Sequence, residues 1–335
     1  MNDYLDEYGR KIPLYTDLME QTRTTLIKML EGEGISLFSV EGRVKTKESL
    51  ELKISRKTYT SPMNDIEDLC GVRVICYYES DLDHIESIIK REYEIISESN
   101  KQKEMDVDRF GYSSRHFIVK IKDDWLAVPN YRGLGGLKVE IQIRTMLMHA
   151  WAAISHKLLY KQEGDAPREI KRNLSKLSAL IELADEKFDT IKRDKVDYIS
   201  NLNMSSDEVI VSEGLNLDNL IVLVEKYSRG RTVNNDDLSQ VLSEIREFDR
   251  TISDFENRIK KCMPYIDAME VEEASFVDDG DLPMWGISGF CRTILDLTCY
   301  EYFYRRWGDY SEKTVLEITE RYRDCLLYTS PSPRD

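Results

Sequence analysis

The chain has 335 residues, 41% of them hydrophobic, and its 62 acidic and 47 basic residues give a formal net charge of −15. This length and composition suffice for one large or two ordinary soluble domains. The acidic charge argues against a protein that binds nucleic acid through a basic surface, and a chain without a run of about 18 apolar residues is not expected to cross a membrane.

Helices and strands are predicted to alternate in the first part of the chain. Apolar residues recur there at helical or alternating spacing, and Gly, Pro, Ser and Asp mark the turns between elements. The predicted helices cover residues 14–32, 48–57, 80–92 and a segment from 145 onward, and the predicted strands cover residues 35–44, 71–78, 116–121 and 138–144. This order is typical of a mixed α/β domain, which we place at residues 1–165.

The second part of the chain, residues 166–335, is predicted to be helical and carries 34 acidic but 23 basic residues. Helices are expected from Pro167 onward and over residues 216–228, 235–263, 285–306 and 311–325. We therefore assign residues 166–326 to an acidic, helix-rich region, and residues 327–335 to a disordered tail or a sequence scar.

Apolar residues in the helix after Pro167 recur with alternating spacings of three and four. They are Leu174, Leu177, Ile181, Ala184, Phe188 and Ile191. Such a seam is typical of helix packing. We favour packing within the protomer over contact between subunits, which remains the alternative.

A cluster of cations spans the first predicted junction between a strand and a helix. It comprises Arg43, Lys45, Ser49, Lys53 and Arg56. The last three residues fall on one face of the predicted helix. Arginine offers a planar fork and lysine a point charge, so the cluster suits a polyphosphate, although an isolated cluster of this kind is also compatible with a solvated basic surface.

Carboxylates accompany two of the predicted strands. Asp68 precedes the strand that contains Arg73, and in the later strand the polar residues Glu140, Gln142 and Arg144 alternate with apolar ones. If the two strands are neighbours, Asp68 and Glu140 can converge on Mg²⁺, which prefers carboxylates and phosphate oxygens. The alternative is that both carboxylates are structural partners of the arginines.

A third element, Gly111-Tyr112-Ser113-Ser114-Arg115-His116, is a predicted turn that leads into a strand. It offers an aromatic ring beside a hydroxyl, a guanidinium and an imidazole, and a nucleotide base could stack on Tyr112. An ordinary surface tyrosine in a turn is the alternative for this motif taken alone.

Together these elements resemble the synthetase domain of the RelA/SpoT family, and most closely its short members, the small alarmone synthetases. The resemblance covers residues 35–162 and keeps the order of four motifs, R-x-K-x3-S-x3-K, D-I-x-D-x-x-G-x-R-V, G-Y-x-S-x-H and V-E-I-Q-I-R-T. A helix with His149 and His156 follows the last motif, and we assign both histidines to packing or to support of the preceding strand. The resemblance implies an α/β synthetase domain with a mixed, nucleotidyltransferase-like sheet, here extended by a helical C-terminal region.

The activity that the resemblance implies is that of a GTP pyrophosphokinase. Such an enzyme transfers pyrophosphate from ATP to the 3′-hydroxyl of GDP or GTP and makes (p)ppGpp, the alarmone of the stringent response. Carried over by position, the residues that bind ATP are Arg43, Lys45, Ser49, Lys53 and Arg56. The residues that hold Mg²⁺ are Asp68 and Glu140, and Glu140 also acts as, or positions, the base. The residues that bind the acceptor are Tyr112, Ser114, His116, Gln142 and Arg144, and those that shape the pocket are Arg73 and Gly111.

One stretch departs from the family's pattern. Residues 104–108 read Glu-Met-Asp-Val-Asp where alarmone synthetases usually carry a lysine-containing stretch, and carboxylates repel an acceptor that bears several phosphates. The main alternative is therefore the toxic branch of the family, which pyrophosphorylates the 3′ CCA end of tRNA or makes adenine alarmones. A non-catalytic, nucleotide-binding regulator is the second alternative.

The remaining expectations concern location and partners. The first residues lack the basic and apolar regions of a signal peptide, so we expect a cytoplasmic protein. The six cysteines form no C-x-x-C pair and the four histidines show no zinc spacing, which favours reduced thiols without redox function. We expect ATP and GDP or GTP as ligands, tRNA as the alternative acceptor, a homo-oligomer as in the family's short members, and no partner among membranes or DNA. No His-Asp dipeptide occurs, so degradation of alarmone is not expected.

Overall fold

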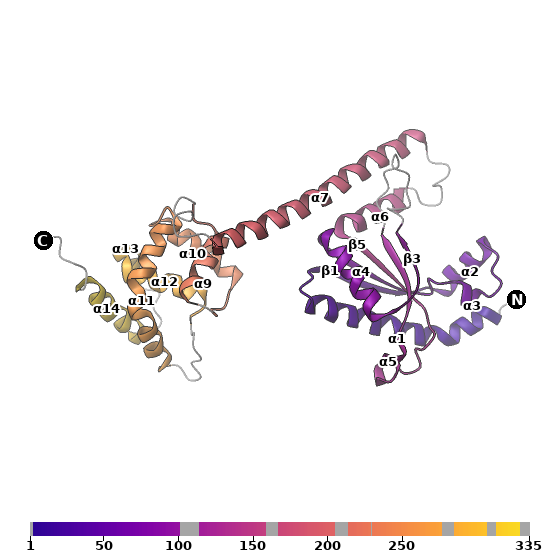
Figure 1. The fold of residues 1–335 in the computed structure, drawn as a ribbon, viewed down its shortest axis with the longest axis horizontal. Coiled ribbons are helices and arrows are strands. Elements are labelled where there is room, and N and C mark those ends of the chain that lie inside the picture. Colours follow the sequence, from indigo (N-terminus) through magenta and orange to yellow (C-terminus); the bar gives the residue numbers. More distant parts are fainter. Residues whose placement is uncertain are drawn as a thin grey trace. The chain divides into compact units, whose positions relative to one another are not determined.

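The computed structural model describes residues 3–100, 114–158, 167–204, 214–228, 230–276, 285–306 and 313–328. The chain forms two compact units, Met1–Arg193 and Asp194–Asp335 (Figure 1). The first combines a mixed sheet with helices and the second is built from helices, which confirms the predicted fold class. Among the described residues, no helix combines the length and the apolar character needed to cross a bilayer.

The first unit begins with a long helix and contains five strands. Its helices are α1 (Asp3–Gly32), α2 (Lys47–Arg56), α3 (Pro62–Asp65), α4 (Ser80–Glu92), α5 (Asp123–Leu126), α6 (Met146–Leu158) and the first part of α7 (Arg168–Met204), with a short 3₁₀ turn over Pro129–Tyr131. Its strands are β1 (Leu37–Val44), β2 (Cys70–Cys76), β3 (Glu94–Asn100), β4 (Arg115–Lys120) and β5 (Val139–Thr145). The sheet has the strand order β1-β2-β5-β4-β3, in which β2 and β5 are parallel and the other neighbours are antiparallel.

One face of the sheet is apolar and packs on helices α1 and α4. Val72 and Val74 of β2 and Ile141 of β5 belong to the same buried core as Leu18 of α1 and Ile85 of α4. Because side chains alternate along a strand, the polar residues between these apolar ones project from the opposite face. The sheet therefore separates a core side from a side that is available for chemistry.

Besides the short helices α3 and α5 and the 3₁₀ turn, which were not predicted, two longer elements of this unit differ from the prediction. Strand β3 was not predicted, because its sequence, Glu-Ile-Ile-Ser-Glu-Ser-Asn, has no alternating apolar pattern and it lies at the edge of the sheet. Helix α1 begins at Asp3 instead of residue 14 and continues through Pro13. Tertiary packing stabilises the added turns, since Tyr8 is fully buried and its hydroxyl donates a 2.5 Å hydrogen bond to the carbonyl oxygen of Lys45.

The boundary between the two units lies within α7, after Arg193, whereas the sequence predicted a boundary after residue 165. The first part of α7 belongs to the sheet unit because Ile181 packs against its core and Asp189 accepts hydrogen bonds of 2.8 and 2.9 Å from Ser80. The apolar seam of α7 is only partly buried. Leu177, Phe188 and Ile191 are 43, 51 and 61% exposed, so the prediction of packing within the protomer is wrong for these three residues.

The second unit has its own buried core, which includes Phe255, Ile259, Phe290 and Ile294. Its helices are α9 (Leu217–Tyr227), α10 (Asn235–Arg246), α11 (Ile252–Ala274), α12 (Ile287–Thr298), α13 (Tyr300–Arg306) and α14 (Lys313–Tyr328). This helical region confirms the predicted class of the C-terminal part, but two of the predicted helices are each divided in two.

The divisions occur at a helix cap and at an extended residue. Thr251 and Asp254 form a capping box that starts α11, which separates it from α10 within the predicted helix over 235–263. Cys299 has an extended backbone and separates α12 from α13. Helix α14 continues to Tyr328, so the start of the predicted tail is helical, and residues 329–335 lie outside the described residues.

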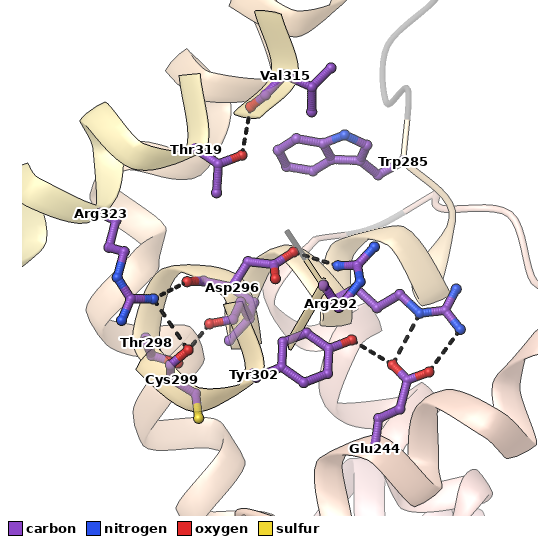
Figure 2. Close-up of polar contacts among 12 residues, drawn as sticks. Glu244, Trp285, Arg292, Asp296, Thr298, Cys299, Tyr302, Val315, Thr319 and Arg323 are labelled. Carbon is purple, nitrogen blue, oxygen red and sulfur yellow. Dashed lines mark hydrogen bonds and ion pairs between the residues drawn. The ribbon is translucent and has the colours of Figure 1, made fainter. Parts of the chain in front are cut away.

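Ion pairs that are partly or fully buried connect segments of the second unit. Glu244 of α10 accepts hydrogen bonds from Arg292 of α12 and from the hydroxyl of Tyr302 of α13 (Figure 2). Arg231 and Glu270, whose side chains are 1 and 5% exposed, form a second pair at 2.7 Å. Buried charges require partners of this quality, so these contacts restrict how the helices can pack.

Candidate functional site

Two rows of residues cross four strands on the face of the sheet opposite the core. Strand pairing places Glu41 of β1, Arg73 of β2, Gln142 of β5 and His116 of β4 in one row. The next row holds Arg43, Gly71, Glu140 and Ile118. Strands β2 and β5 are neighbours, as the convergence of Asp68 and Glu140 requires. Polar residues that alternate with apolar ones in sequence thus become one surface.

The arginines of this surface are held by neighbouring strands. Arg73 donates a 3.0 Å hydrogen bond to Glu41 and a 3.4 Å hydrogen bond to Gln142. Arg43 and Arg73 line one small cavity of about 80 Å³ together with Glu140 and Gln142. Gly71 lies beside the Arg43 side chain, and a Cβ at that position would be in ordinary van der Waals contact with it, at 3.8 Å.

His116 and Glu140 form the central pair of the site. The Nδ1 atom of His116 lies 2.7 Å from a carboxylate oxygen of Glu140, and its Nε2 atom lies 2.6 Å from the hydroxyl of Ser114. Burial raises the pKa of Glu140, but the hydrogen bond and the charge of His116 outweigh it, so the pKa is lowered overall. Glu140 is therefore ionised near neutral pH, and it accepts a hydrogen bond from Nδ1 of His116, while Nε2 of the same ring is hydrogen-bonded to the hydroxyl of Ser114.

A buried arginine extends this network. Arg144 is 7% exposed and donates hydrogen bonds of 2.7 Å to Gln142 and 3.3 Å to Ser114. Burial and the charge of Arg73 lower its pKa to about 10, so it keeps its positive charge at neutral pH. The four described acceptor residues of the prediction, Ser114, His116, Gln142 and Arg144, are thus connected through hydrogen bonds. Gly111 and Tyr112 lie outside the described residues.

The predicted phosphate-binding cations line a second, larger cavity. Thr46 caps helix α2 by accepting a hydrogen bond from the backbone nitrogen of Ser49, and the helix places three of the residues on one face. The cavity has a volume of about 600 Å³ and is lined by Lys45, Ser49, Lys53 and Arg56 from the prediction and by Leu52, Lys57, Tyr59 and His156. The structure therefore brings together four of the five residues predicted to bind ATP, while Arg43 lines the small cavity described above.

Asp68 connects the strand surface with this cation cavity. Its two carboxylate oxygens accept hydrogen bonds of 2.9 Å from Lys45 and 2.8 Å from Lys53. Burial raises the pKa of Asp68, but the two lysines lower it overall, so the carboxylate is ionised near neutral pH. The charge of Asp68 in turn opposes the ionisation of Glu140 and acts to raise its pKa.

This pair of carboxylates suits a hard cation that also binds phosphate. Within the described residues, no group of three or more His, Cys, Asp or Glu side chains is arranged to hold a metal ion. Mg²⁺ commonly uses one or two protein carboxylates and completes its shell with water and phosphate oxygens. Asp68 and Glu140 are ionised carboxylates, the kind of ligand that Mg²⁺ uses, and Asp68 bonds two lysines that line the larger cavity.

Sequence reasoning missed several residues of the site. Glu41 pairs with Arg73, and Lys57, Tyr59 and His156 line the larger cavity. Lys57 and Tyr59 could have been identified from the sequence, because they directly follow the cation motif. His149, which the sequence assigned to packing or support, has a buried Nδ1 atom without a hydrogen-bond partner among the described residues, and burial lowers its pKa.

Known proteins resemble the part of the chain that carries this site. A family model described as a region found in RelA/SpoT proteins matches residues 42–165. GTP pyrophosphokinase YwaC of Bacillus subtilis (strain 168) is 30% identical over 158 residues, which are 46% of this chain and 73% of that protein. GTP pyrophosphokinase YjbM of the same strain is 30% identical over 196 residues, which are 56% of this chain and 89% of that protein. A crystal structure of small alarmone synthetase 1 from Bacillus subtilis is 25% identical and has a TM-score of 0.49, covering 57% of this chain and 99% of that structure.

Proposed function

The chain belongs to the RelA/SpoT family of GTP pyrophosphokinases, and we propose that it transfers the β,γ-pyrophosphate of ATP to the 3′-hydroxyl of GDP or GTP. The observation that carries this proposal is the position of Asp68 between Lys45 and Lys53, two lysines that line a cavity of about 600 Å³. Two cations beside a carboxylate on one large cavity are what a complex of a polyphosphate with a divalent cation requires.

In this proposal the cation cavity binds the donor. Lys45, Lys53 and Arg56 contact the phosphates of ATP, Ser49 adds a hydroxyl, and Arg43 stacks on or clamps the adenine nucleotide. The lysines exchange their contact with Asp68 for phosphate oxygens when the donor enters. Asp68 and Glu140 would then hold Mg²⁺, which would supply charge neutralisation for the transferred group.

Glu140 prepares the acceptor hydroxyl in this scheme. Its carboxylate is kept ionised by His116, so it can accept the proton of the 3′-hydroxyl or hold that hydroxyl toward the phosphorus atom. Ser114 and Arg144 fix the imidazole and the neighbouring amide of Gln142 through the contacts described above. Transfer occurs directly between the two nucleotides, so positioning and charge stabilisation carry the reaction and no covalent nucleophile is needed.

The identity of the acceptor is the finer part of the proposal. Guanosine nucleotides are our first choice because both curated relatives are named GTP pyrophosphokinases. The acidic residues Glu104, Asp106 and Asp108 favour an acceptor without 5′ polyphosphate, such as the 3′ end of tRNA. This stretch lies outside the described residues, so the choice rests on its sequence.

One transfer assay tests the function and the acceptor together. ATP labelled in its β and γ phosphates is incubated with the full chain and with GDP, GTP or bulk tRNA in parallel. Glu140→Gln is the loss-of-function variant, and Glu67→Gln is the matched control, because Glu67 is 41% exposed and pairs with Lys138 outside the two cavities.

Each outcome of the assay selects one function. Label on GDP or GTP that is retained in Glu67→Gln and lost in Glu140→Gln supports the proposal. Label on tRNA alone contradicts the guanosine acceptor and identifies the toxic alternative. Absence of transfer to any acceptor contradicts the proposed enzyme and leaves the nucleotide-binding regulator.

A further inference from the structure

A second large cavity lies within the Asp194–Asp335 unit, apart from the residues assigned to catalysis. Its volume is about 600 Å³, and three cationic side chains line it, those of Arg250, Arg258 and Lys261. Asn257, Arg258 and Lys261 follow one another at spacings that place them on one face of α11. Leu297 and Leu326 contribute an apolar part of the wall.

The two acidic residues of the cavity wall are already engaged. Asp249 is 4% exposed, and both of its carboxylate oxygens accept hydrogen bonds from Nε of Arg258, at 2.8 and 2.9 Å. Asp254 belongs to the capping box and accepts from the backbone nitrogen and the hydroxyl of Thr251, at 3.0 and 2.8 Å. These contacts fix the acidic groups in place and leave the cations to determine what the cavity attracts.

Arg258 is also held rigidly. Its Nη1 atom donates hydrogen bonds of 3.3 Å to the carbonyl oxygen and to the hydroxyl of Thr298 at the end of α12. A guanidinium that is fixed by a carboxylate on one side and by a helix end on the other is preorganised. It can bind an incoming anion without losing further side-chain entropy.

Arg250 and Lys261 are exceptions among the cations of this unit. In the described part of residues 194–335, every other lysine and arginine side chain forms an ion pair with a carboxylate or donates to a backbone carbonyl. Arg250 and Lys261 make no side-chain hydrogen bond or ion pair with any described residue, and both line the same cavity. In a unit with 29 acidic and 16 basic residues, such a coincidence is not expected from a surface without function.

We propose that this cavity binds a small molecule that carries a phosphate or pyrophosphate group. Arg250 and Lys261 neutralise the phosphate, Arg258 orients it, and the apolar wall accommodates the rest of the molecule. The volume lies within the range of about 300 to 1,000 Å³ that is typical of small-molecule sites. A long polyanion such as RNA is disfavoured, because the cations converge on one cavity and the unit as a whole is acidic.

Binding of labelled inorganic pyrophosphate to the full chain, measured by equilibrium dialysis, tests the proposal. The double variant Arg250→Gln, Lys261→Gln removes the two unpaired cations. The matched control is Lys260→Gln, Lys313→Gln, which removes the same charge from residues that pair with Glu256 and Glu317 and do not line the cavity. ADP and a single-stranded RNA 12-mer are tested as competitors.

The proposal makes distinct predictions for these chains. The wild type and the control bind one more equivalent of pyrophosphate than the double variant. In the double variant, the affinity of the cavity at Arg258 for pyrophosphate falls by about tenfold or more, because hydrogen bonds to charged groups are lost. Pyrophosphate protects the backbone amides of residues 250–261 from hydrogen exchange in the control and leaves them unprotected in the double variant. ADP competes for the additional equivalent.

Several results would overturn the proposal. One is equal stoichiometry and affinity in the double variant and the control, and another is an equal loss in both, which would reveal a general effect of charge. If the RNA 12-mer binds more tightly than pyrophosphate and protects the same backbone amides, the ligand of the cavity is a nucleic acid and the proposed small molecule is wrong. Both substituted side chains lack partners among the described residues, so we expect the wild-type melting temperature, and Lys261→Gln alone repeats the test if the double variant unfolds.

Discussion

Thr145, the last residue of the strand that carries Glu140, donates a 2.5 Å hydrogen bond to the carboxylate of Asp185 on helix α7. Asp185 is 1% exposed, and the second oxygen of its carboxyl group has no hydrogen-bond partner among the described residues. One helical turn further along, Asp189 binds Ser80, and Lys192 forms a 2.7 Å ion pair with Asp81. Helix α7 is therefore attached to the sheet unit by polar contacts along its buried face.

The buried carboxyl of Asp185 makes stability depend on pH. Burial, assisted by the charges of Glu79 and Asp189, raises its pKa from 3.8 to about 7. Between these values the folded chain retains a proton that the unfolded chain has released, so the free energy of unfolding falls as the pH rises through this window. We predict that Asp185→Asn flattens this fall and makes the chain more stable than the wild type above pH 7.

Urea unfolding at several pH values between 5 and 8 checks this prediction. Asp194→Asn serves as the control, because it removes an exposed carboxylate from the same helix. Glu273, whose pKa burial also raises to about 7, contributes equally to all three chains and cancels in the comparison. An Asp185→Asn curve that runs parallel to that of the wild type would rule out Asp185 as the source.

The pair of His116 and Glu140 predicts a shift in the pH dependence of activity. Without the imidazole, the pKa of Glu140 rises, because burial then acts without the opposing hydrogen bond and charge. We expect His116→Gln to move the acidic limb of the kcat/KM profile for pyrophosphate transfer to higher pH, and to lower the rate at neutral pH by about tenfold to a hundredfold. Ser114→Ala keeps the imidazole and should leave the acidic limb at its wild-type pH. An acidic limb at the same pH in His116→Gln and Ser114→Ala would argue against a role of His116 in lowering the pKa of Glu140.

The sequence predicted which residues lie on the polar face of the sheet, but it did not predict the contacts that these residues make across neighbouring strands. The alternation of Glu140, Gln142 and Arg144 with apolar residues was sufficient to place them on one face, because the period of a strand is two. The partner of Arg73 was not predictable, since Glu41 is brought beside it by the antiparallel pairing of β1 and β2. Contacts between residues far apart in sequence depend on strand order, which local patterns do not determine.

The helix that follows Pro167 shows a similar limit. Its apolar seam predicted a buried face, but the residues that pack on the sheet unit include Asp185 and Asp189, which lie beside that seam. A polar residue is predicted to be exposed unless a partner for it is known. The partners of Asp185 and Asp189 are Thr145 and Ser80, which are far away in the sequence and therefore could not be identified from the local pattern. The amphipathic pattern therefore identified the helix but was wrong about the burial of Leu177, Phe188 and Ile191.

The contact of Lys53 with Asp68 predicts a specific defect in donor binding. Lys53→Gln removes one of the two lysines that contact Asp68 and line the cavity, so we expect KM for ATP to rise by about tenfold with a smaller change in kcat. Lys47→Gln is the matched control, because Lys47 lies on the same helix and does not line the cavity. Steady-state kinetics with varied ATP separate the two variants, and an equal rise in KM for both would indicate a general charge effect in place of a phosphate contact.

The exposed seam of α7 predicts self-association of the chain. Leu177 and Phe188 are 43 and 51% exposed on this helix, and burying the exposed half of such side chains against a second copy is favourable by roughly 0.7 to 1.5 kcal/mol each, half of the value for a fully exposed side chain. We expect the wild type to elute as an oligomer in size-exclusion chromatography with light scattering, and Leu177→Asp with Phe188→Asp to elute at the mass of one chain. Because neither side chain is buried within the protomer, the melting temperature of a diluted sample should change little. Ile181 packs against the core and is left intact, so that a folding defect does not imitate dissociation. An unchanged mass in the double variant would show that the seam does not hold copies of the chain together.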